Sequence, residues 1–250
     1  MLNDEIASFK DVWPGGYCEG NPSDPLGSSS YVEHDKFNGY ADQLAIAAAK
    51  GIKARQIGYL STLYVTYLMC IRNQTRDKIV LEIGPGAGAW SKCILGDGAK
   101  HLYALDAKSA EDNNFFGYVG ASPEVCDRVT YDQVSDFSCN SVPDRGIEFF
   151  FSFGCFCHLS RDATTAYFEA ISRKMISGAR GFVMISDYAK LAAALAVDES
   201  AEDWDRPRPG RWYNIGCSWF RDMVEARGFR VIDPDIGCNL RDPVVHFERR

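Results

Sequence analysis

The chain of 250 residues contains 46% hydrophobic and 24% charged residues, an ordinary globular composition that suffices for one large domain. Its 27 Lys and Arg against 34 Asp and Glu give a net charge of −7, which does not attract phosphate backbones, so we expect no nucleic-acid partner. Nine cysteines without a CxxC pair, no run of about 18 apolar residues and no N-terminal signal region predict a cytoplasmic protein with reduced thiols and no membrane partner.

The first third of the chain is predicted to cover the rest. Residues 1–39 combine many Pro and Gly with aromatic side chains, which favours an ordered cap, although a simple packing arm also fits. Residues 40–72 have a helical apolar periodicity that Gly51 and Gly58 divide into two helices. We therefore expect a cap with helices at 1–75 and a core at 76–250, together forming one compact domain.

Beyond residue 77, short apolar runs alternate with helical segments, a pattern typical of a mostly parallel sheet covered by helices. Strands are predicted at 79–83, 101–106, 129–134, 147–153, 181–186, 229–232 and 244–247. Helices are predicted at 88–96, from Ser160 or Asp162 to Ser177 before Gly178, and at 217–227 before Gly228. The fold class is thus α/β.

A glycine-rich turn follows the first predicted strand. Gly84, Gly86 and Gly88 let the backbone approach a ligand and present amide groups to it. The spacing G-x-G-x-G departs from the dinucleotide fingerprint G-x-G-x-x-G. The carboxylate of Glu82 suits a cofactor with a cationic amino group better than it suits a pyrophosphate.

Two further acids follow the next two strands. Asp106 ends the second strand, where a carboxylate can accept hydrogen bonds from both ribose hydroxyls of either a nicotinamide or a methyl-donor cofactor. Asp136 follows the third strand and can accept the adenine amino proton, with Ser135 as a further hydrogen-bonding group and Phe137 as an apolar wall.

The motif E-x-G-x-G-x-G, with Asp106 and Asp136 at the following strand ends, resembles the class I S-adenosylmethionine-dependent methyltransferases. The resemblance implies a Rossmann-like fold, a seven-stranded sheet whose last strand is antiparallel, and S-adenosyl-L-methionine as cofactor. It implies that the methionine end, the ribose and the adenine are bound in that order along the sheet edge. The implied cofactor residues are Glu82, Gly84, Pro85, Gly86, Gly88, Asp106, Ala107, Ser135, Asp136, Phe137 and Ser152.

Two other segments, WPGGY…EGNP…SSY near the N-terminus and FFFSFGCFCHLS after the fourth strand, look similar to sugar O-methyltransferases of bacterial surface-polysaccharide pathways. This second resemblance implies methyl transfer to an oxygen of a small polar acceptor, such as a sugar or a nucleotide-linked or phosphorylated intermediate of capsule or lipopolysaccharide biosynthesis. A phosphoramidate or another small metabolite remains an alternative acceptor.

Three residues are candidates for catalysis by in-line displacement. His158 follows the fourth strand and can remove a proton from an attacking hydroxyl. His34 in the cap is a second candidate base, and alignment alone can suffice without a base. Asp187 ends the fifth strand and can hold a sugar hydroxyl; no second acid close to it completes a metal site, and Cys155 with Cys157 gives too few zinc ligands, so no metal is predicted.

The acceptor is expected between the cap and the segment 198–214, whose arginines suit anion recognition but could also pair with neighbouring acids. The candidate substrate-binding residues are Tyr17, Ser29, Ser30, Tyr31, Arg208 and Arg211. Two rival interpretations remain: a nicotinamide-dependent oxidoreductase, and a non-catalytic protein that binds S-adenosylmethionine as a sensor or scaffold.

Overall fold

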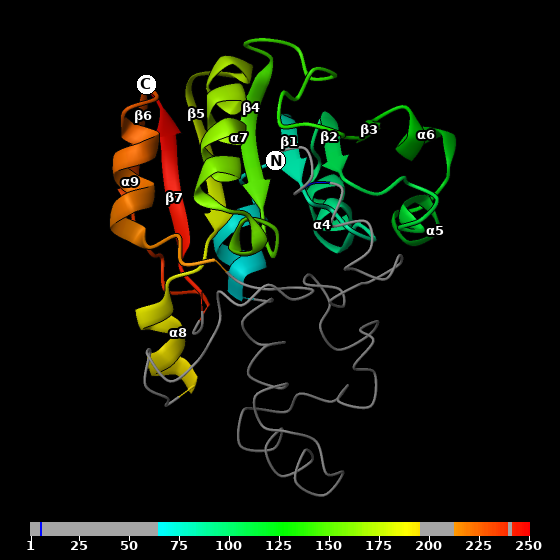
Figure 1. Ribbon diagram of the computed structural model, residues 1–250. Helices are drawn as coiled ribbons and strands as arrows, with labels where there is room; N and C mark the ends of the chain where they lie inside the picture. Colours follow the sequence, from blue (N-terminus) through cyan, green and yellow to red (C-terminus); the bar gives the residue numbers. More distant parts are fainter. Residues whose placement is uncertain (1–5, 7–64, 196–212, 240–241) are drawn as a thin grey trace, which may run out of the picture.

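The computed structural model describes residues 6, 65–195, 213–239 and 242–250. Within these residues, seven strands form one open sheet in the order β3-β2-β1-β4-β5-β7-β6 (Figure 1). Neighbours are parallel from β3 to β5, whereas β7 is antiparallel to both β5 and β6. The predicted mostly parallel sheet with an antiparallel last strand is confirmed. The strands are β1 (Ile79–Ile83), β2 (His101–Asp106), β3 (Val129–Gln133), β4 (Ile147–Ser152), β5 (Met175–Met184), β6 (Phe229–Asp233) and β7 (Val244–Arg249).

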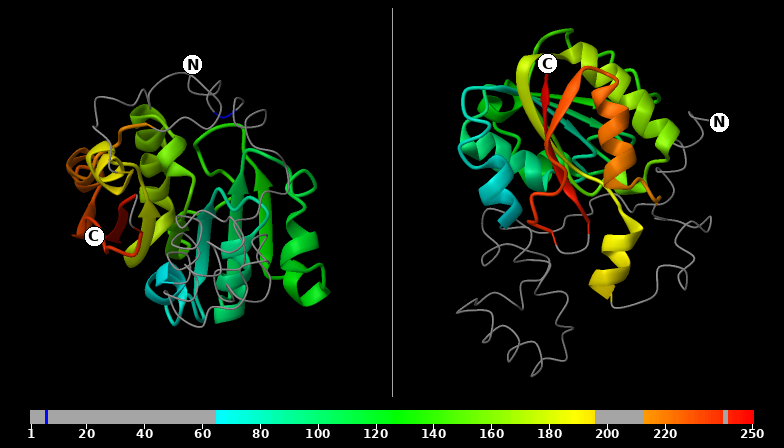
Figure 2. Two further views of the ribbon diagram at one scale, coloured as in Figure 1. Left: turned by 90° about the horizontal axis from the view of Figure 1, so that it is seen from below. Right: turned by 90° about the vertical axis from the view of Figure 1, so that its left-hand side faces the viewer.

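Helices cover both faces of the sheet. One face packs against α7 and α9, and the other against α4, α5 and the short π-helix η2; Figure 2 shows α7 and α9 on the opposite side of the sheet from η2. None of the helices in the described part of the chain is long and apolar enough to cross a membrane. The helical segments are η2 (Tyr67–Ile71), α4 (Ala89–Asp97), α5 (Phe115–Val119), α6 (Pro123–Cys126), η3 (Phe156–His158), α7 (Arg161–Lys174), α8 (Tyr188–Leu195) and α9 (Cys217–Glu225).

The position of β4 in the middle of the sheet explains why its sequence is almost wholly apolar. Phe150 points into the cluster beneath α7, where its ring lies 6.1 Å from that of Phe168. Its neighbours Phe149 and Phe151 point into the opposite cluster, and Phe151 lies 5.2 Å from Trp90 of α4. Alternating side chains therefore fill both layers, as expected for a strand that is covered on each face.

The structure corrects the boundary between α7 and β5. The helix begins after Ser160, whose hydroxyl accepts a hydrogen bond from the Ala163 amide, as predicted. It ends at Lys174 instead of continuing to Ser177, and the next strand begins at Met175 instead of Gly181. The carbonyl of Lys174 accepts from the Gly146 amide, which draws the chain into an extended path, so that Gly178 lies within β5.

The other predicted strands and helices in the core form within one or two residues of their expected bounds. The sequence prediction missed α5, α6, η3 and α8. The structure describes only the C-terminal end of the predicted helical segment 40–72, where Cys70 and Ile71 of η2 are buried. The cap at 1–39 apart from Ile6, the division at Gly51 and Gly58, and most of the segment 198–214 lie outside the described residues.

Candidate functional site

The loop between β1 and α4 has a backbone conformation that favours glycine. The φ angles of Gly84, Gly86 and Gly88 are +74°, +54° and +95°, in the left-handed region that other residues rarely adopt. Space also demands glycine, because a Cβ at Gly84 would lie 2.6 Å from the Cβ of Cys155. The predicted loop therefore exists, with Pro85 buried within it, and it brings backbone amides to the start of α4.

Asp106, at the end of β2, connects this loop to the next one. Its carboxylate accepts hydrogen bonds from the Gly86 amide at 3.1 Å and from the Lys108 amide at 2.9 Å. Burial raises the pKa of Asp106, and these donors oppose the rise. Ala107 follows, half-buried against the core, and its carbonyl accepts from Gln133. Asp106 thus lies where a ligand seated on the glycine loop would meet a carboxylate.

Two residues that the sequence did not indicate help to hold Asp106. Asn113, which is buried, hydrogen-bonds to Asp106 and donates to the Tyr131 hydroxyl at 2.9 Å. The Tyr131 hydroxyl in turn donates to the Lys108 carbonyl at 2.9 Å. An Asn in a loop and a Tyr in a strand are common, so no sequence signal distinguishes this pair; tertiary contact alone reveals it.

Glu82 occupies a buried position on β1. It is 1% exposed, and Ser91 of α4 donates a hydrogen bond to its Oε2 at 2.5 Å. Burial raises the pKa of Glu82 to about 8; the Ser91 bond opposes this shift, and the charge of Asp106 adds to it. A cation placed beside Glu82 would favour its ionised form.

The residues after β3 divide into two kinds. Asp136 is half-buried and accepts hydrogen bonds from the amide and the hydroxyl of Ser138, at 2.8 and 2.5 Å, which lower its pKa. Ser135 is exposed. Phe137 is buried in the core, where its ring meets that of Tyr167 edge-on at 4.8 Å. Asp136 therefore presents a charged carboxylate at this edge, while Phe137 lies within the core.

The segment after β4 lies against the glycine loop. The buried Ser152 hydroxyl donates to the Ile83 carbonyl at 2.7 Å, and Cys155 abuts Gly84. His158 ends the short helix η3 and is 7% exposed. The neighbouring Cys157 carbonyl accepts from the Tyr213 amide at 3.1 Å. The fold thus brings His158 to the same sheet edge as the glycine loop.

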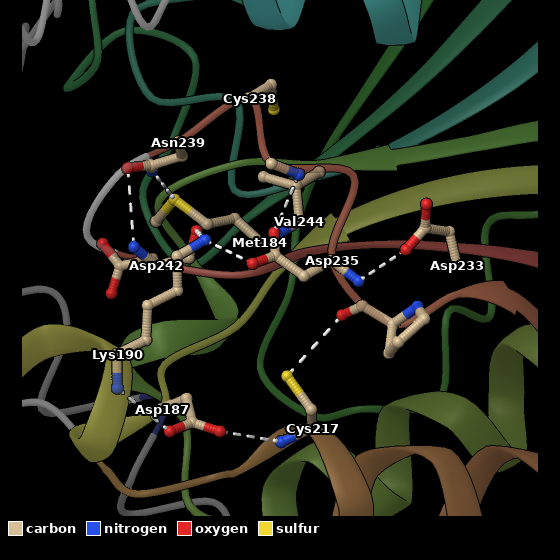
Figure 3. A network of polar contacts seen from close by, with 12 residues as sticks. Met184, Asp187, Lys190, Cys217, Asp233, Asp235, Cys238, Asn239, Asp242 and Val244 are labelled. Carbon is tan, nitrogen blue, oxygen red and sulfur yellow. Dashed lines mark hydrogen bonds and ion pairs between the residues drawn. The ribbon is translucent and has the colours of Figure 1, made fainter.

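Asp187 has a well-defined structural task. One carboxylate oxygen accepts from the amides of Ala189 and Lys190, at 3.1 and 3.4 Å, at the start of α8. The other accepts from the Cys217 amide at 3.2 Å, at the start of α9 (Figure 3). These contacts favour a role in joining two helices. The place of Asp187 among the catalytic candidates stays a prediction.

Across the described residues, no group of three or more His, Cys, Asp and Glu side chains could hold a metal ion. Several of the predicted residues lie outside the described part of the chain, namely Tyr17, Ser29, Ser30, Tyr31, His34, Arg208 and Arg211.

No protein-family model matches the sequence, and neither does any curated protein. The fold, however, is similar to solved structures. An S-adenosylmethionine dependent methyltransferase from Mesorhizobium loti is 13% identical, with a TM-score of 0.56 over 75% of this chain and 98% of that one. The 1,6-didemethyltoxoflavin-N1-methyltransferase of Burkholderia thailandensis, with bound 1,6-didemethyltoxoflavin and S-adenosylhomocysteine, is 16% identical, with a TM-score of 0.54 over 84% and 86% of the two chains. The chain has the Rossmann-like fold of these proteins, as predicted.

Proposed function

We propose that the chain is an S-adenosylmethionine-dependent methyltransferase whose cofactor lies along the carboxyl ends of β1, β2 and β3. The observation that supports this most is Asp106, whose carboxylate is hydrogen-bonded to the Gly86 amide beside the buried carboxyl group of Glu82. Ligands of open α/β sheets bind outside the carboxyl ends of the strands. One structural neighbour is named with bound S-adenosylhomocysteine, which supports this choice of cofactor.

The polar groups at this edge suit the three parts of the cofactor. Glu82 would face the cationic amino group, Asp106 the ribose hydroxyls and Asp136 the adenine amino group. Asp106 already accepts from two backbone amides, yet a carboxylate has about four lone-pair positions and so keeps acceptor capacity for a ribose hydroxyl. Among Gly84, Pro85, Gly86 and Gly88, the glycines allow the backbone to approach the methionine end closely.

The reaction that we propose is a single in-line displacement. The cofactor supplies an electrophilic methyl group on its sulfonium sulfur. The glycine loop, against which Cys155 packs at Gly84, and Asp106 would hold that group in a fixed position. His158 accepts the proton of the attacking acceptor oxygen.

The acceptor that we propose is an oxygen of a small polar molecule, either a sugar or a nucleotide-linked or phosphorylated intermediate of surface-polysaccharide biosynthesis. Its support is the likeness of the segments around Tyr17 and His158 to sugar O-methyltransferases, and the arginines of 198–214. A phosphoramidate or another small metabolite is the alternative. The fold does not fix the acceptor atom, since one structural neighbour is named as an N1-methyltransferase.

Calorimetric titration of S-adenosylhomocysteine tests the cofactor. We expect wild-type protein to bind and Asp106→Asn to bind roughly ten- to a hundredfold more weakly, because hydrogen bonds to a charged group are lost. Asp112→Asn, an exposed carboxylate in the following loop, is the matched control and should bind as the wild type does. Binding of NADH instead of S-adenosylhomocysteine would overturn the proposal in favour of an oxidoreductase.

A panel of nucleotide sugars and phosphorylated metabolites, scored by mass spectrometry for one added methyl, tests the acceptor. His158→Ala should lower kcat and leave the affinity for S-adenosylhomocysteine unchanged. A protein that binds the cofactor but methylates no acceptor, and in which His158→Ala changes nothing, would instead be a sensor or scaffold.

A further inference from the structure

The guanidinium group of Arg161 is held in one orientation by two contacts. Arg161 is exposed and begins α7, three residues after His158. Its Cζ atom lies 5.0 Å from the centroid of the Trp219 ring, and its Nη2 donates a hydrogen bond of 3.1 Å to the Ile215 carbonyl. A side chain that is already ordered loses little further conformational freedom when it binds a ligand. Arg161 is therefore oriented before any ligand arrives.

The segment that holds Arg161 crosses the carboxyl ends of β4 and β5. The Tyr213 amide donates to the Cys157 carbonyl of η3, which follows β4, at 3.1 Å. The Gly216 amide donates to the Ser186 carbonyl, which follows β5, at 3.0 Å. The carbonyl that Arg161 binds lies between these two contacts in the chain. Arg161 therefore lies at the edge of the sheet where open α/β folds bind their ligands.

Neither an ion pair nor the stability of α7 explains a cation at this position. The protein has a net charge of −7, so carboxylates are plentiful, yet Arg161 forms no ion pair with any carboxylate that the structure describes. Other arginines of the described chain do form such pairs, namely Arg180, Arg221, Arg227 and Arg230. In the first turn of a helix, the macrodipole disfavours a positive charge. A guanidinium has five N–H donors, and Arg161 uses one of them for the Ile215 carbonyl.

We propose that Arg161 binds a phosphate group of the methyl acceptor, so that the acceptor is a phosphorylated or nucleotide-linked molecule rather than a neutral sugar. A guanidinium matches two phosphate oxygens with two parallel hydrogen bonds. Trp219 supports one face of the guanidinium, and its remaining donors suit an anion at the same edge as His158. The proposal rests on the methyl transfer proposed above, and it names the chemical group by which the acceptor is recognised.

Calorimetric titration of pyrophosphate at low ionic strength, without cofactor, tests Arg161 itself. We expect wild-type protein to bind and Arg161→Gln to bind roughly tenfold or more weakly, because charged hydrogen bonds are lost. Arg221→Gln is the matched control, since it removes the same charge from an exposed arginine that is paired with Asp222 on α9. It should bind as the wild type does. No binding to the wild type, or equal affinities of wild type and Arg161→Gln, would show that the proposal is wrong.

Two further variants separate orientation from charge. Arg161→Lys keeps the positive charge but loses the planar fork, and should bind pyrophosphate several-fold more weakly than the wild type. Trp219→Leu keeps the arginine but removes the ring beneath it, and should also weaken binding several-fold. Wild-type affinity in both variants would mean that the anion is attracted by charge alone, which would overturn the assignment of an oriented phosphate site.

Three probes, titrated in the presence of saturating S-adenosylhomocysteine, identify the source of the phosphate: glucose, glucose 1-phosphate and UDP-glucose. One or both phosphate-bearing probes should bind roughly tenfold more tightly than glucose and lose this advantage in Arg161→Gln. The tighter of the two tells a sugar phosphate from a nucleotide-linked sugar. Glucose that binds as tightly as both would contradict the proposal. If S-adenosylhomocysteine does not bind the wild type, the proposed methyl transfer fails, whereas the pyrophosphate titration still reports on Arg161.

Discussion

The hydroxyl of Ser91, in the first turn of α4, donates a hydrogen bond of 2.5 Å to the carboxyl group of Glu82 on β1. The contact joins the strand before the glycine loop to the helix after it. Because Glu82 is 1% exposed, water does not solvate its charge, and its pKa rises to about 8 in spite of the Ser91 donor. At neutral pH, the free protein therefore holds Glu82 mainly in its protonated form.

The first prediction concerns stability. The pKa of Glu82 is raised from 4.5 in the unfolded chain to about 8 in the folded protein, so the folded state binds the extra proton between these values. Its contribution to stability is full below about pH 4.5 and is lost as the pH rises towards 8. Glu82→Gln mimics the protonated form. The melting temperature of Glu82→Gln minus that of the wild type should increase by roughly 5–10 °C from pH 5 to pH 7, as measured by calorimetric scans.

The control for this prediction is Glu124→Gln, which alters an exposed carboxylate on α6. Its melting temperature should follow that of the wild type at every pH. A difference between Glu82→Gln and wild type that stays constant from pH 5 to pH 8 would show that Glu82 is ionised throughout.

The second prediction couples this proton to the proposed cofactor. A cationic amino group beside Glu82 favours the carboxylate, so binding at pH 7 should release close to one proton. The affinity for S-adenosylhomocysteine should fall roughly tenfold for each unit of pH below about 7. Calorimetry in buffers with different ionisation enthalpies measures the release, and Glu82→Gln should abolish it. Equal binding heats in all buffers would contradict the prediction.

The third prediction separates backbone conformation from space at the glycine loop. Gly84→Ala places a Cβ at φ +74° and 2.6 Å from the Cβ of Cys155, so we expect it to cost about 2–4 kcal/mol in the free energy of unfolding. Gly178→Ala has a similar φ of +81° but nothing within 4 Å, and should cost about 1–2 kcal/mol.

A double-mutant cycle completes this test. In a Cys155→Gly background, Gly84→Ala should cost no more than Gly178→Ala does, because the clash is gone and the strained φ remains. The measurement is urea denaturation at pH 7. Equal costs for Gly84→Ala in both backgrounds would mean that Cys155 does not limit the space at the loop.

The strands and the positions of Glu82, Asp106 and Asp136 could be predicted because both depend on local pattern. A buried strand needs a continuous apolar run, and an acid near its last residue comes to the carboxyl edge of the sheet. The role of Asn113 could not be predicted, because it depends on contacts with Asp106 and Tyr131, which lie on two different strands.

The predicted end of α7 was wrong for a related reason. Met175 and Ile176 extend the apolar periodicity of the helix, and Gly178 resembles a helix stop. Bonds from distant amides to the carbonyls of Arg173 and Lys174 decide the outcome, since they place this stretch beside the chain at Arg145 and Gly146. Local propensity cannot report a partner that lies elsewhere in the chain.

The hydrogen bonds of Asp187 to the starts of α8 and α9 also bear on how changes in length between these helices would affect the fold. The Asp187 carboxylate accepts from the amides of Lys190 and Cys217, and so both ends of the intervening stretch are held by a single side chain that follows β5. With the ends already together, lengthening that stretch adds only the slowly growing entropy of a closed loop, about 0.6 kcal/mol for each doubling. A longer or shorter stretch between these two anchors is therefore expected to leave the strands undisturbed.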